Sequence, residues 1–384
     1  MKILIDLRPI IYDYYSGIGN YSRSIFENIL KIAPNNQYIV FLNSFKKTIY
    51  HPQEWENNKN VKILNLKIPN KVLDMSFKFL SPMRLERFID FDIAFSPHFN
   101  ILSTKMPRVL TIHDLSFIDR PDFFDFRKNL WHYLQNVGYQ IKSAKHIIAV
   151  SKFTKSRIID LFKIPEEKIS VIYSGVDHKF KRLPQTDIRL KNFQNKYDLN
   201  YPFILYLGAC EPRKNLVSIV KVFNILKKEL FYRDWKLVLA SSNSWLSELM
   251  EKEIKNSPFK NDIKRISMLS DEDKIYLYNL AQVFVYPSFY EGFGFPPLEA
   301  QACGVPVVSS NRTSLPEILK DSAILIDPWQ LDKLYLGIKK VTQDMLEREK
   351  FINLGISNAQ NYSWQKAAEK TLEVLQSNSR SDYN

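Results

Sequence analysis

The chain has 384 residues, more than the roughly 250–300 that one hydrophobic core usually supports, so two domains are expected. Hydrophobic residues make up 45% and charged residues 25%, a composition that excludes a mainly disordered protein. Two cysteines are too few for a disulfide framework, and no apolar run approaches the ~20 residues that span a bilayer. We therefore expect a soluble protein of the reducing cytoplasm.

The net charge is +13, and most of the excess lies in the first half of the chain. Residues 1–180 carry 26 Lys and Arg against 17 Asp and Glu. A basic surface attracts nucleic acid, anionic lipid headgroups or acidic small molecules. The charge alone does not choose among these partners.

Short apolar runs alternate with longer amphipathic stretches through the first half. Asp6 and Arg8 interrupt the first run, so the start of the chain predicts a β-strand rather than a signal peptide. Runs of this length that end at polar residues are typical of buried parallel strands. The expected strands are 3–5, 39–42, 61–64, 93–96, 109–112 and 147–150.

The second half repeats this alternation, and two sets of βα units predict an α/β fold with two doubly wound parallel sheets. The polar segment between Pro184 and Pro202 predicts the boundary region between the domains. The expected strands are 203–207, 236–240, 283–286, 305–309 and 323–326, and the clearest helices are 216–230 and 271–281.

Glycine placement indicates where a ligand would bind. Seven of the ten glycines lie at expected strand ends or in the loops that follow, namely residues 17, 19, 175, 208, 292, 294 and 304. Glycine is favoured where the backbone needs a positive φ or approaches a ligand closely. Because ligands of open α/β sheets bind beyond the carboxyl ends of the strands, these loops predict the site.

The segment 283–304, VFVYPSFYEGFGFPPLEAQACG, is the strongest local motif. A buried strand runs into a loop with two glycines, and two prolines then open a helix. The N-terminal end of such a helix attracts phosphate. Glu291 and Glu299 are carboxylates that accept hydrogen bonds from ligand hydroxyl groups. An ordinary βα loop with solvated glutamates is the alternative.

This segment resembles the retaining nucleotide-sugar glycosyltransferases of family 4. Their hallmark is a glutamate, seven residues and a second glutamate, which stands here as EGFGFPPLE from Glu291 to Glu299. Other landmarks occur in the family's order along nearly the whole chain. They are SGIGNYS at 16–22, TIHDLSF at 111–117, AVSKFTKSRI at 149–158, VIYSGVD at 171–177, LGACEPRKNL at 207–216 and YSWQKAAEKTLEVL at 362–375.

The resemblance implies the GT-B architecture, in which two Rossmann-like domains face a central cleft. We expect residues 1–180 to form the acceptor-side domain and residues 181–362 to bind the nucleotide sugar. Residues 363–384 are expected to form a C-terminal helix that crosses back to the first domain.

The implied reaction moves a hexose from a nucleotide diphosphate sugar to a saccharide or lipid-linked saccharide, with retention of anomeric configuration. The segments EPRKNL and FYEGFGFPPLE resemble those of the family's mannosyltransferases. This resemblance favours GDP-mannose as the donor and the synthesis of a bacterial surface polysaccharide such as lipopolysaccharide as the process. No cofactor and no metal is implied. The implied catalytic residues are His113, Asp114 and Glu291. The implied donor-binding residues are Gly17, Gly19, Gly208, Arg213, Lys214, Ser267, Met268, Glu291, Gly292, Phe293, Gly294, Phe295, Leu298 and Glu299.

Arg213 and Lys214 follow an expected strand, where they can neutralise the charge of a diphosphate leaving group. A solvated helix start is the alternative. The family usually has an arginine directly after the glycine, where this chain has Ala209. We expect Arg213 to substitute for it, and the division of work with Lys214 stays open.

Four other segments are assigned by position. His113 ends an expected strand, and the resemblance puts it near the donor sugar, with Asp114 shaping the reaction centre. Gly17 and Gly19 are expected in a loop before a helix over 20–32, and a simple tight turn is the alternative. His98 is a candidate for acceptor contact, while Ser267-Met268 corresponds to the loop beside the nucleobase.

Two acidic motifs imitate metal sites. Asp90-Phe91-Asp92 has the Asp-x-Asp form of metal-dependent glycosyltransferases, but it precedes a buried strand and is expected to be an exposed strand entry. Residues 271–273 are all acidic and are expected in the first turn of a helix, where the helix dipole favours them.

Residues 59–88 carry seven Lys and Arg against Asp74 and Glu86, interleaved with Phe, Leu and Met. Such a segment predicts peripheral contact with an anionic membrane at its inner face, near a lipid-linked acceptor. A solvated helix face is the alternative. Two other functions are considered, a basic protein that binds nucleic acid and a nucleotide-sugar epimerase of the same fold.

Overall fold

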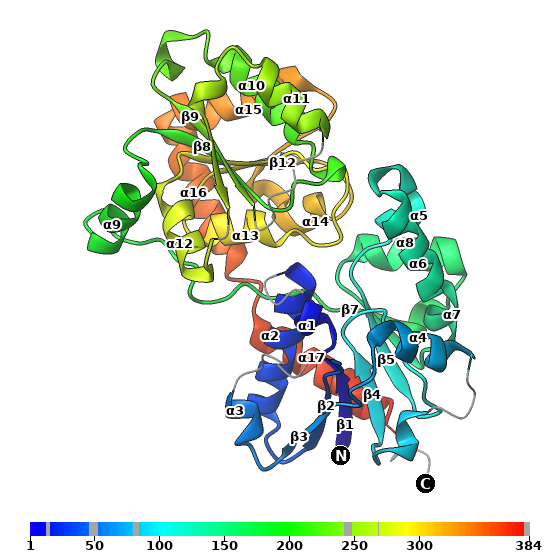
Figure 1. The fold of residues 1–384 in the computed structure, drawn as a ribbon. Helices are drawn as coiled ribbons and strands as arrows, with labels where there is room; N and C mark the ends of the chain where they lie inside the picture. The colour runs from blue at the N-terminus through cyan, green and yellow to red at the C-terminus, as the bar shows by residue number, and fades with distance from the viewer. Residues whose placement is uncertain (13–15, 46–52, 80–83, 242–247, 268, 380–384) are drawn as a thin grey trace. The chain divides into compact units, whose positions relative to one another are not determined.

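The computed structural model describes residues 1–12, 16–45, 53–79, 84–241, 248–267 and 269–379. The chain forms two compact units (Figure 1). Unit 1 comprises Met1–Gly175 and Trp364–Asn384, and unit 2 comprises Val176–Ser363. The first unit therefore ends at residue 175, against the sequence-based bound of 180, and the chain re-enters it at residue 364.

Unit 1 is built on seven parallel strands in the order β3-β2-β1-β4-β5-β6-β7. The strands are β1 (Lys2–Asp6), β2 (Gln37–Phe41), β3 (Val61–Leu64), β4 (Ile93–Ser96), β5 (Arg108–Ile112), β6 (His146–Ala149) and β7 (Ile169–Val171). The helices are α1 (Pro9–Tyr12), α2 (Gly17–Ile32), α3 (Gln53–Glu56), α4 (Asn70–Phe79), α5 (Ser116–Asp119), α6 (Phe126–Gln135), α7 (Val137–Ser143), α8 (Lys152–Phe162) and α17 (Trp364–Ser377), with short 3₁₀ helices η1 (Leu85–Arg87), η2 (Pro121–Phe123) and η3 (Glu166–Lys168). The last helix, α17, packs against α2 at the other end of the sequence (Figure 1).

Unit 2 is built on six parallel strands in the order β10-β9-β8-β11-β12-β13. The strands are β8 (Phe203–Leu207), β9 (Lys236–Ser241), β10 (Ile263–Ser267), β11 (Val283–Tyr286), β12 (Val307–Ser310) and β13 (Ile324–Ile326). The helices are α9 (Ile188–Tyr197), α10 (Leu216–Leu226), α11 (Glu248–Asn256), α12 (Asp271–Leu280), α13 (Phe295–Ala302), α14 (Leu315–Leu319), α15 (Leu331–Gln343) and α16 (Met345–Ala359), with η4 (Pro212–Lys214), η5 (Leu230–Tyr232), η6 (Lys260–Asp262) and η7 (Lys320–Ser322). Helices α10 and α15 cover one face of the sheet, while α12 and α13 cover the other (Figure 1).

The strands are continuous apolar runs because helices bury both sheet faces. All five residues of β5 and all five of β8 are buried. Each sheet reverses its strand order once, because β1 pairs with β2 and β4, and β8 pairs with β9 and β11. A reversal of this kind opens a crevice at the carboxyl ends of the two central strands. The arrangement confirms the predicted class of two doubly wound parallel sheets.

Two helices begin earlier than the sequence predicted. Helix α2 begins at Gly17, where a loop reaching residue 19 was expected, because the side chain of Ser16 caps it and accepts a hydrogen bond from the Gly19 amide at 3.0 Å. Helix α13 begins at Phe295, one residue before the two prolines that the sequence predicted to open it. No helix in the described ranges is both long and apolar enough to cross a membrane.

Candidate functional site

The candidate site of unit 2 lies where β8 and β11 end, at the reversal of strand order. Asn215 joins the loops that follow three strands, because its amide donates hydrogen bonds to the carbonyl oxygens of Pro287 at 3.2 Å and Pro328 at 2.9 Å. Its side chain is buried and its φ is +57°, a conformation that Asn tolerates better than most residues. The loops after β8, β11 and β13 are thus fixed relative to one another.

Two glycines allow the backbone to turn at these strand ends. Gly208 directly follows β8 with φ of +154°, and a Cβ there would lie 2.9 Å from the Tyr206 hydroxyl. Gly294 directly precedes α13 with φ of +104°, and a Cβ there would lie 2.8 Å from Leu315 Cδ2. Any larger residue at either position would strain the loop.

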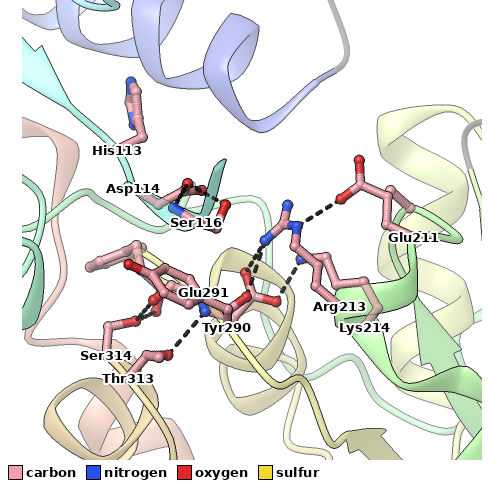
Figure 2. A network of polar contacts seen from close by, with 12 residues as sticks. His113, Asp114, Ser116, Glu211, Arg213, Lys214, Tyr290, Glu291, Thr313 and Ser314 are labelled. Atoms are coloured by element: carbon pink, nitrogen blue, oxygen red, sulfur yellow. Dashed lines mark hydrogen bonds and ion pairs between the residues drawn. The ribbon is translucent and has the colours of Figure 1, made fainter. Parts of the chain in front are cut away.

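Arg213, Lys214 and Glu291 form one cluster at the site. Figure 2 shows both cations extending from the loop after β8 toward Glu291, which follows β11. The Lys214 ammonium donates to Glu291 Oε1 at 2.6 Å, and Arg213 Nη1 lies 3.4 Å from Glu291 Oε2. Arg213 also donates to Glu211 Oε2 at 2.7 Å and to the Tyr290 carbonyl at 3.1 Å. The sequence placed the three residues at one sheet edge, and the structure brings them into contact.

Burial sets the electrostatics of this cluster. Lys214 is only 6% exposed and Glu291 only 5%, whereas Arg213 keeps 17% of its side chain exposed. Burial, followed by the nearby charge of Arg213, lowers the pKa of Lys214, while Glu291 opposes that shift. The ammonium also donates to the hydroxyl of Tyr286 at 2.7 Å. The carboxylate and the phenol therefore compensate a cation that has lost most of its water.

The backbone of Glu291 is held by the loop that follows β12. Its amide donates to Thr313 Oγ1 at 3.0 Å, and its carbonyl accepts from the hydroxyl of Ser314 at 2.9 Å (Figure 2). The same hydroxyl reaches the carbonyl of Phe293 at 3.2 Å. These bonds fix the start of the glycine-containing loop before α13.

Glu299 belongs to a second polar group, separate from the first cluster. It lies in α13, half-buried, and accepts a hydrogen bond from the Tyr278 hydroxyl at 3.0 Å. Burial raises the pKa of its carboxyl group, and the charges of Lys274 and Lys179 oppose this shift. Glu299 thus lies beside the Tyr278 hydroxyl and is under the influence of the Lys274 and Lys179 charges, which favour its ionised, hydrogen-bond-accepting form.

The other residues that the sequence analysis assigned to binding of the nucleotide sugar differ in exposure. The side chain of Leu298 is fully buried, and Phe293 is 5% exposed, so both pack in the core of unit 2. Gly292 is buried as well, and Phe295 is half-buried at the start of α13. Ser267 is exposed at the end of β10. Met268 lies outside the described residues.

In unit 1, His113 directly follows β5. Its Nε2 lies 2.8 Å from the carbonyl oxygen of Pro97, and because a carbonyl only accepts, Nε2 carries the proton. Burial lowers the pKa of His113, while the bond to Pro97 and the charge of Asp114 oppose this shift. The imidazole meets the ring of Tyr21 edge-on at 4.7 Å. His113 is therefore held in a fixed orientation at the carboxyl edge of this sheet.

Asp114 and the first glycines are engaged in local structure. Asp114 Oδ1 accepts from the amide of Ser116 at 3.0 Å and from its hydroxyl at 2.7 Å (Figure 2). Gly17 and Gly19 lie in the first turn of α2. His98, in the loop after β4, is 8% exposed, and its Nδ1 is buried without a hydrogen-bond partner among the described residues.

The acidic motifs make ordinary contacts. Asp90 pairs with the Lys2 ammonium at 2.6 Å, and Asp92 accepts from the Lys2 amide at 2.7 Å. Asp271, in the first turn of α12, pairs with Lys274 at 2.8 Å and with Lys179 at 3.3 Å. Within the described part of the chain, no three His, Cys, Asp or Glu side chains are grouped to hold a metal ion.

Several residues at these sites escaped the sequence analysis. Glu211 accepts a hydrogen bond from Arg213, and Tyr286 accepts one from Lys214. Tyr278 donates a hydrogen bond to Glu299. Thr313 and Ser314 bond the backbone of Glu291. Glu211 stands inside the motif EPRKNL, so its spacing of two from Arg213 was a signal. Tyr278 and Tyr286 lie in sequence stretches typical of the core, and nothing in these stretches indicates their hydrogen bonds to Glu299 and Lys214.

The chain matches two models of glycosyltransferase domains. The model described as Glycosyltransferase Family 4 matches residues 35–180, and the one described as Glycosyl transferases group 1 matches residues 187–358. Together they cover most of both units.

Named relatives and solved structures agree with these matches. O-antigen chain mannosyltransferase B of Escherichia coli is 30% identical over 384 residues, covering 97% of this chain and 99% of that protein. The serotype-specific mannosyltransferase WbdA of Escherichia coli is 28% identical over 280 residues, covering 71% of this chain and 34% of WbdA. Anabaena HepE, solved with UDP and glucose, superposes with a TM-score of 0.73 at 17% identity over 98% of this chain and 100% of HepE. The chain belongs to the glycosyltransferases of family 4 and has their GT-B fold.

Proposed function

We propose that this glycosyltransferase moves mannose from GDP-mannose to a saccharide or lipid-linked saccharide in the synthesis of a bacterial surface polysaccharide. The observation that carries the proposal is the cluster of Arg213, Lys214 and Glu291 where β8 and β11 end. Reversal points of doubly wound sheets bind nucleotides, and paired cations there suit a diphosphate. The two E. coli relatives described above are named as mannosyltransferases, which supports mannose as the sugar.

We assign the donor's diphosphate chiefly to Arg213. The Arg213 side chain is 17% exposed, whereas the Lys214 side chain is 7% exposed and its ammonium is bonded to Glu291 and Tyr286. Arg213 would thus reach the diphosphate, and Lys214 would orient the Glu291 carboxylate toward the sugar. Glu299 would accept hydrogen bonds from the ribose hydroxyls. Under this assignment, Arg213 would take the place of the arginine that the family usually has where this chain has Ala209.

We further propose that transfer retains the anomeric configuration and needs no metal ion. Glu291 is paired with two cations and Glu211 with Arg213, so both carboxylates of the cluster have a role other than attack on the sugar. Departure of the diphosphate and attack of the acceptor on the same face of the sugar require no enzymic nucleophile. Arg213 and the N-terminal end of α13 supply positive charge to the leaving diphosphate.

His113 and Asp114 are proposed to act on the acceptor side. The protonated Nε2 of His113 is used by Pro97, so Nδ1 is the ring nitrogen that would accept a hydrogen bond from a hydroxyl group. The relatives described above are transferases and give no support to nucleic-acid binding or epimerisation. Location in the cytoplasm stays a prediction.

The test is a transfer assay with a mannose-terminated acceptor on a lipid-like aglycone. GDP-mannose, UDP-glucose and ADP-glucose are offered in separate reactions, and product is followed by mass spectrometry. The proposal expects product with GDP-mannose, and an α-linkage by NMR because the donor is α-linked. UDP-glucose is the alternative donor, since HepE was solved with UDP and glucose. Product from UDP-glucose alone would assign a different donor, and a β-linkage would exclude retention.

A further inference from the structure

A cavity of unit 2 lies at the amino ends of its central strands, at the sheet edge opposite the cluster around Glu291. Its volume is about 420 Å³, and residues of α9, α12 and α16 line it (Figure 1). Of its other lining residues, Pro202 directly precedes β8, Gln282 directly precedes β11, and Val305 stands two residues before β12. Small-molecule sites have volumes of roughly 300–1,000 Å³. This space, which we call the amino-edge cavity, is therefore large enough for a ligand.

Arg182 is held at the wall of the amino-edge cavity by bonds on both sides of it in the chain. The buried side chain of Asn279 accepts a hydrogen bond from the Leu183 amide at 2.7 Å and donates one to the Lys181 carbonyl at 3.0 Å. The aliphatic part of Arg182 lies over Gly304, where a Cβ would be 2.9 Å from Arg182 Cδ. Gly304 also has a φ of +74°, so both the close contact and the backbone favour glycine there. The backbone and the aliphatic stem of Arg182 are therefore fixed beside the cavity.

Arg348 of α16 is the second cation at this wall. Its Nη1 donates to the carbonyl oxygen of Gln282 at 2.6 Å and lies 3.4 Å from that of Val341. Burial lowers the pKa of Arg348, the charge of Glu349 opposes this shift, and the charge of Arg182 adds to it. The two guanidinium groups are therefore close enough to repel each other, and an anion between them would relieve that repulsion.

Neither arginine is neutralised by a carboxylate of the described residues. In unit 2, ion pairs with Asp or Glu are made by Arg189, Arg213, Arg265 and Arg312. Arg182 and Arg348 make no such pair within the part of the chain that the structure describes, although exposed Glu349 also lines the cavity. The neighbouring Glu347 is paired with Lys340 at 3.2 Å and with Lys350 at 3.6 Å. Two arginines against one glutamate leave the lining with one excess positive charge.

Amide side chains add neutral hydrogen-bonding groups to this lining. Gln185, Gln194, Asn200 and Gln282 line the cavity, and their amide groups make no hydrogen bond with other described residues. The hydroxyl of Tyr201, another lining residue, is buried without a hydrogen-bond partner in the described ranges. Amides both donate to and accept from hydroxyl groups, whereas the fork of a guanidinium group fits the oxygens of a phosphate. The lining therefore matches a molecule that combines a phosphate with hydroxyl groups.

We propose that the amino-edge cavity binds the phosphate group of a small hydroxyl-rich molecule, such as a hexose phosphate, between Arg182 and Arg348. The guanidinium groups would donate to the phosphate oxygens, and the amides of the lining would bond the hydroxyl groups. The inference goes beyond the proposed function. It concerns the opposite edge of the sheet from Glu291 and does not depend on the donor or the reaction.

The experiment is calorimetric titration of the full chain with glucose 6-phosphate, inorganic phosphate and glucose. We expect glucose 6-phosphate to bind more tightly than phosphate, and glucose to show no detectable binding. Arg182→Gln and Arg348→Gln should each weaken the binding of glucose 6-phosphate by about tenfold or more, because each removes charge-assisted hydrogen bonds. Glu349→Gln removes a repelling charge and should strengthen this binding by about two- to fivefold.

Two control variants locate the binding. Arg233→Gln changes an exposed arginine of unit 2 that does not line the cavity, and should bind glucose 6-phosphate as the unaltered chain does. Arg213→Ala, at the proposed diphosphate site, should also bind it unchanged, whereas Arg182→Gln should keep its affinity for GDP. The two sites are thus tested independently of each other.

Thermal unfolding of every variant checks that the fold is kept. Because Arg348 also bonds the carbonyl of Gln282, Arg182→Gln decides the question if Arg348→Gln does not fold. No binding of glucose 6-phosphate, or unchanged affinity in Arg182→Gln, would overturn the proposal. So would binding that is lost in Arg213→Ala and kept in Arg182→Gln, because the phosphate would then lie at the proposed donor site. Equal affinities for phosphate and glucose 6-phosphate would refute the role of the amides.

Discussion

The ammonium of Lys214 and the carboxylate of Glu291 form a buried ion pair at 2.6 Å, although 77 positions separate them in the chain. The pair exists because β8 and β11 are neighbours in the sheet, so the loops after these strands meet. A charge left alone at this depth would be poorly solvated. The two residues therefore act as one unit, and substitutions of either one report on both.

The first prediction concerns the stability of this pair. Glu291→Gln or Lys214→Met leaves the partner charge buried, which typically costs about 3–5 kcal/mol of unfolding free energy. The double variant removes both charges and should be less destabilised than the sum of the single variants. Urea unfolding of the four proteins measures the coupling. Strictly additive losses would mean that the ion pair is not formed in solution.

The second prediction separates the two glutamates kinetically. Glu299 is assigned to ribose hydroxyls that do not react, so Glu299→Ala should mainly raise the donor KM, by roughly ten- to a hundredfold. Glu291 is assigned to the sugar, whose charge and shape change during transfer, so Glu291→Ala should mainly lower kcat. Urea unfolding of both alanine variants tests whether loss of folding causes the change. Unchanged kinetics in both alanine variants would refute these roles.

The third prediction is that transfer does not need a metal ion. Arg213 and the N-terminal end of α13 are proposed to take the charge of the leaving diphosphate. Initial rates with and without excess EDTA should therefore agree closely. An enzyme that loses all activity in EDTA and regains it with Mn²⁺ or Mg²⁺ would contradict this site for the diphosphate.

The fourth prediction is a loss of stability in mild acid. Burial lowers the pKa values of His98, His113, His132 and His146 of unit 1 from the ordinary value of 6.5. Below about pH 6.5 these histidines bind protons in the unfolded chain more readily than in the folded chain. The free energy of unfolding therefore falls as the pH falls. Urea unfolding midpoints at about pH 7.5 and about pH 5.5 measure the effect.

A variant identifies the group responsible. His98→Asn removes one buried imidazole and should make the midpoint less dependent on pH. His178→Asn, at a fully exposed position, is the matched control and should leave the dependence as it is. Equal midpoints at the two pH values in the unaltered chain would contradict the burial of these histidines.

The sequence predicted the strands of the sheet interior well. Four strands, β3, β4, β8 and β11, have the residues that the apolar runs indicated. Three of them, β4, β8 and β11, are central strands whose two faces are covered by helices, whereas β3 lies at a sheet edge. Two strands were missed, β7 with three residues and β10 with Lys264 and Arg265 in its middle. Both lie at sheet edges, where one side of the strand is open and apolar continuity is not required.

The site could be predicted only in part. The motifs placed Glu291, Arg213 and Lys214 at strand ends, and in the structure the three side chains meet. The bond of Glu299 to Tyr278 could not be foreseen, because it depends on how α13 packs beside α12. Helix α6 was not predicted, and the exposure of Phe126, Leu130 and Tyr133 could not be foreseen, because apolar side chains at this spacing normally face the core.

Calorimetric titration of GDP into the chain tests the central claim, a nucleotide site where β8 and β11 end, most directly. Arg213→Ala and Glu299→Ala are titrated beside Lys350→Ala, whose side chain is exposed on α16. The account predicts that GDP binds the unaltered chain and Lys350→Ala equally, and binds each of the other two variants about tenfold or more weakly. No binding of GDP, UDP or ADP, or equal affinity in all four proteins, would contradict it.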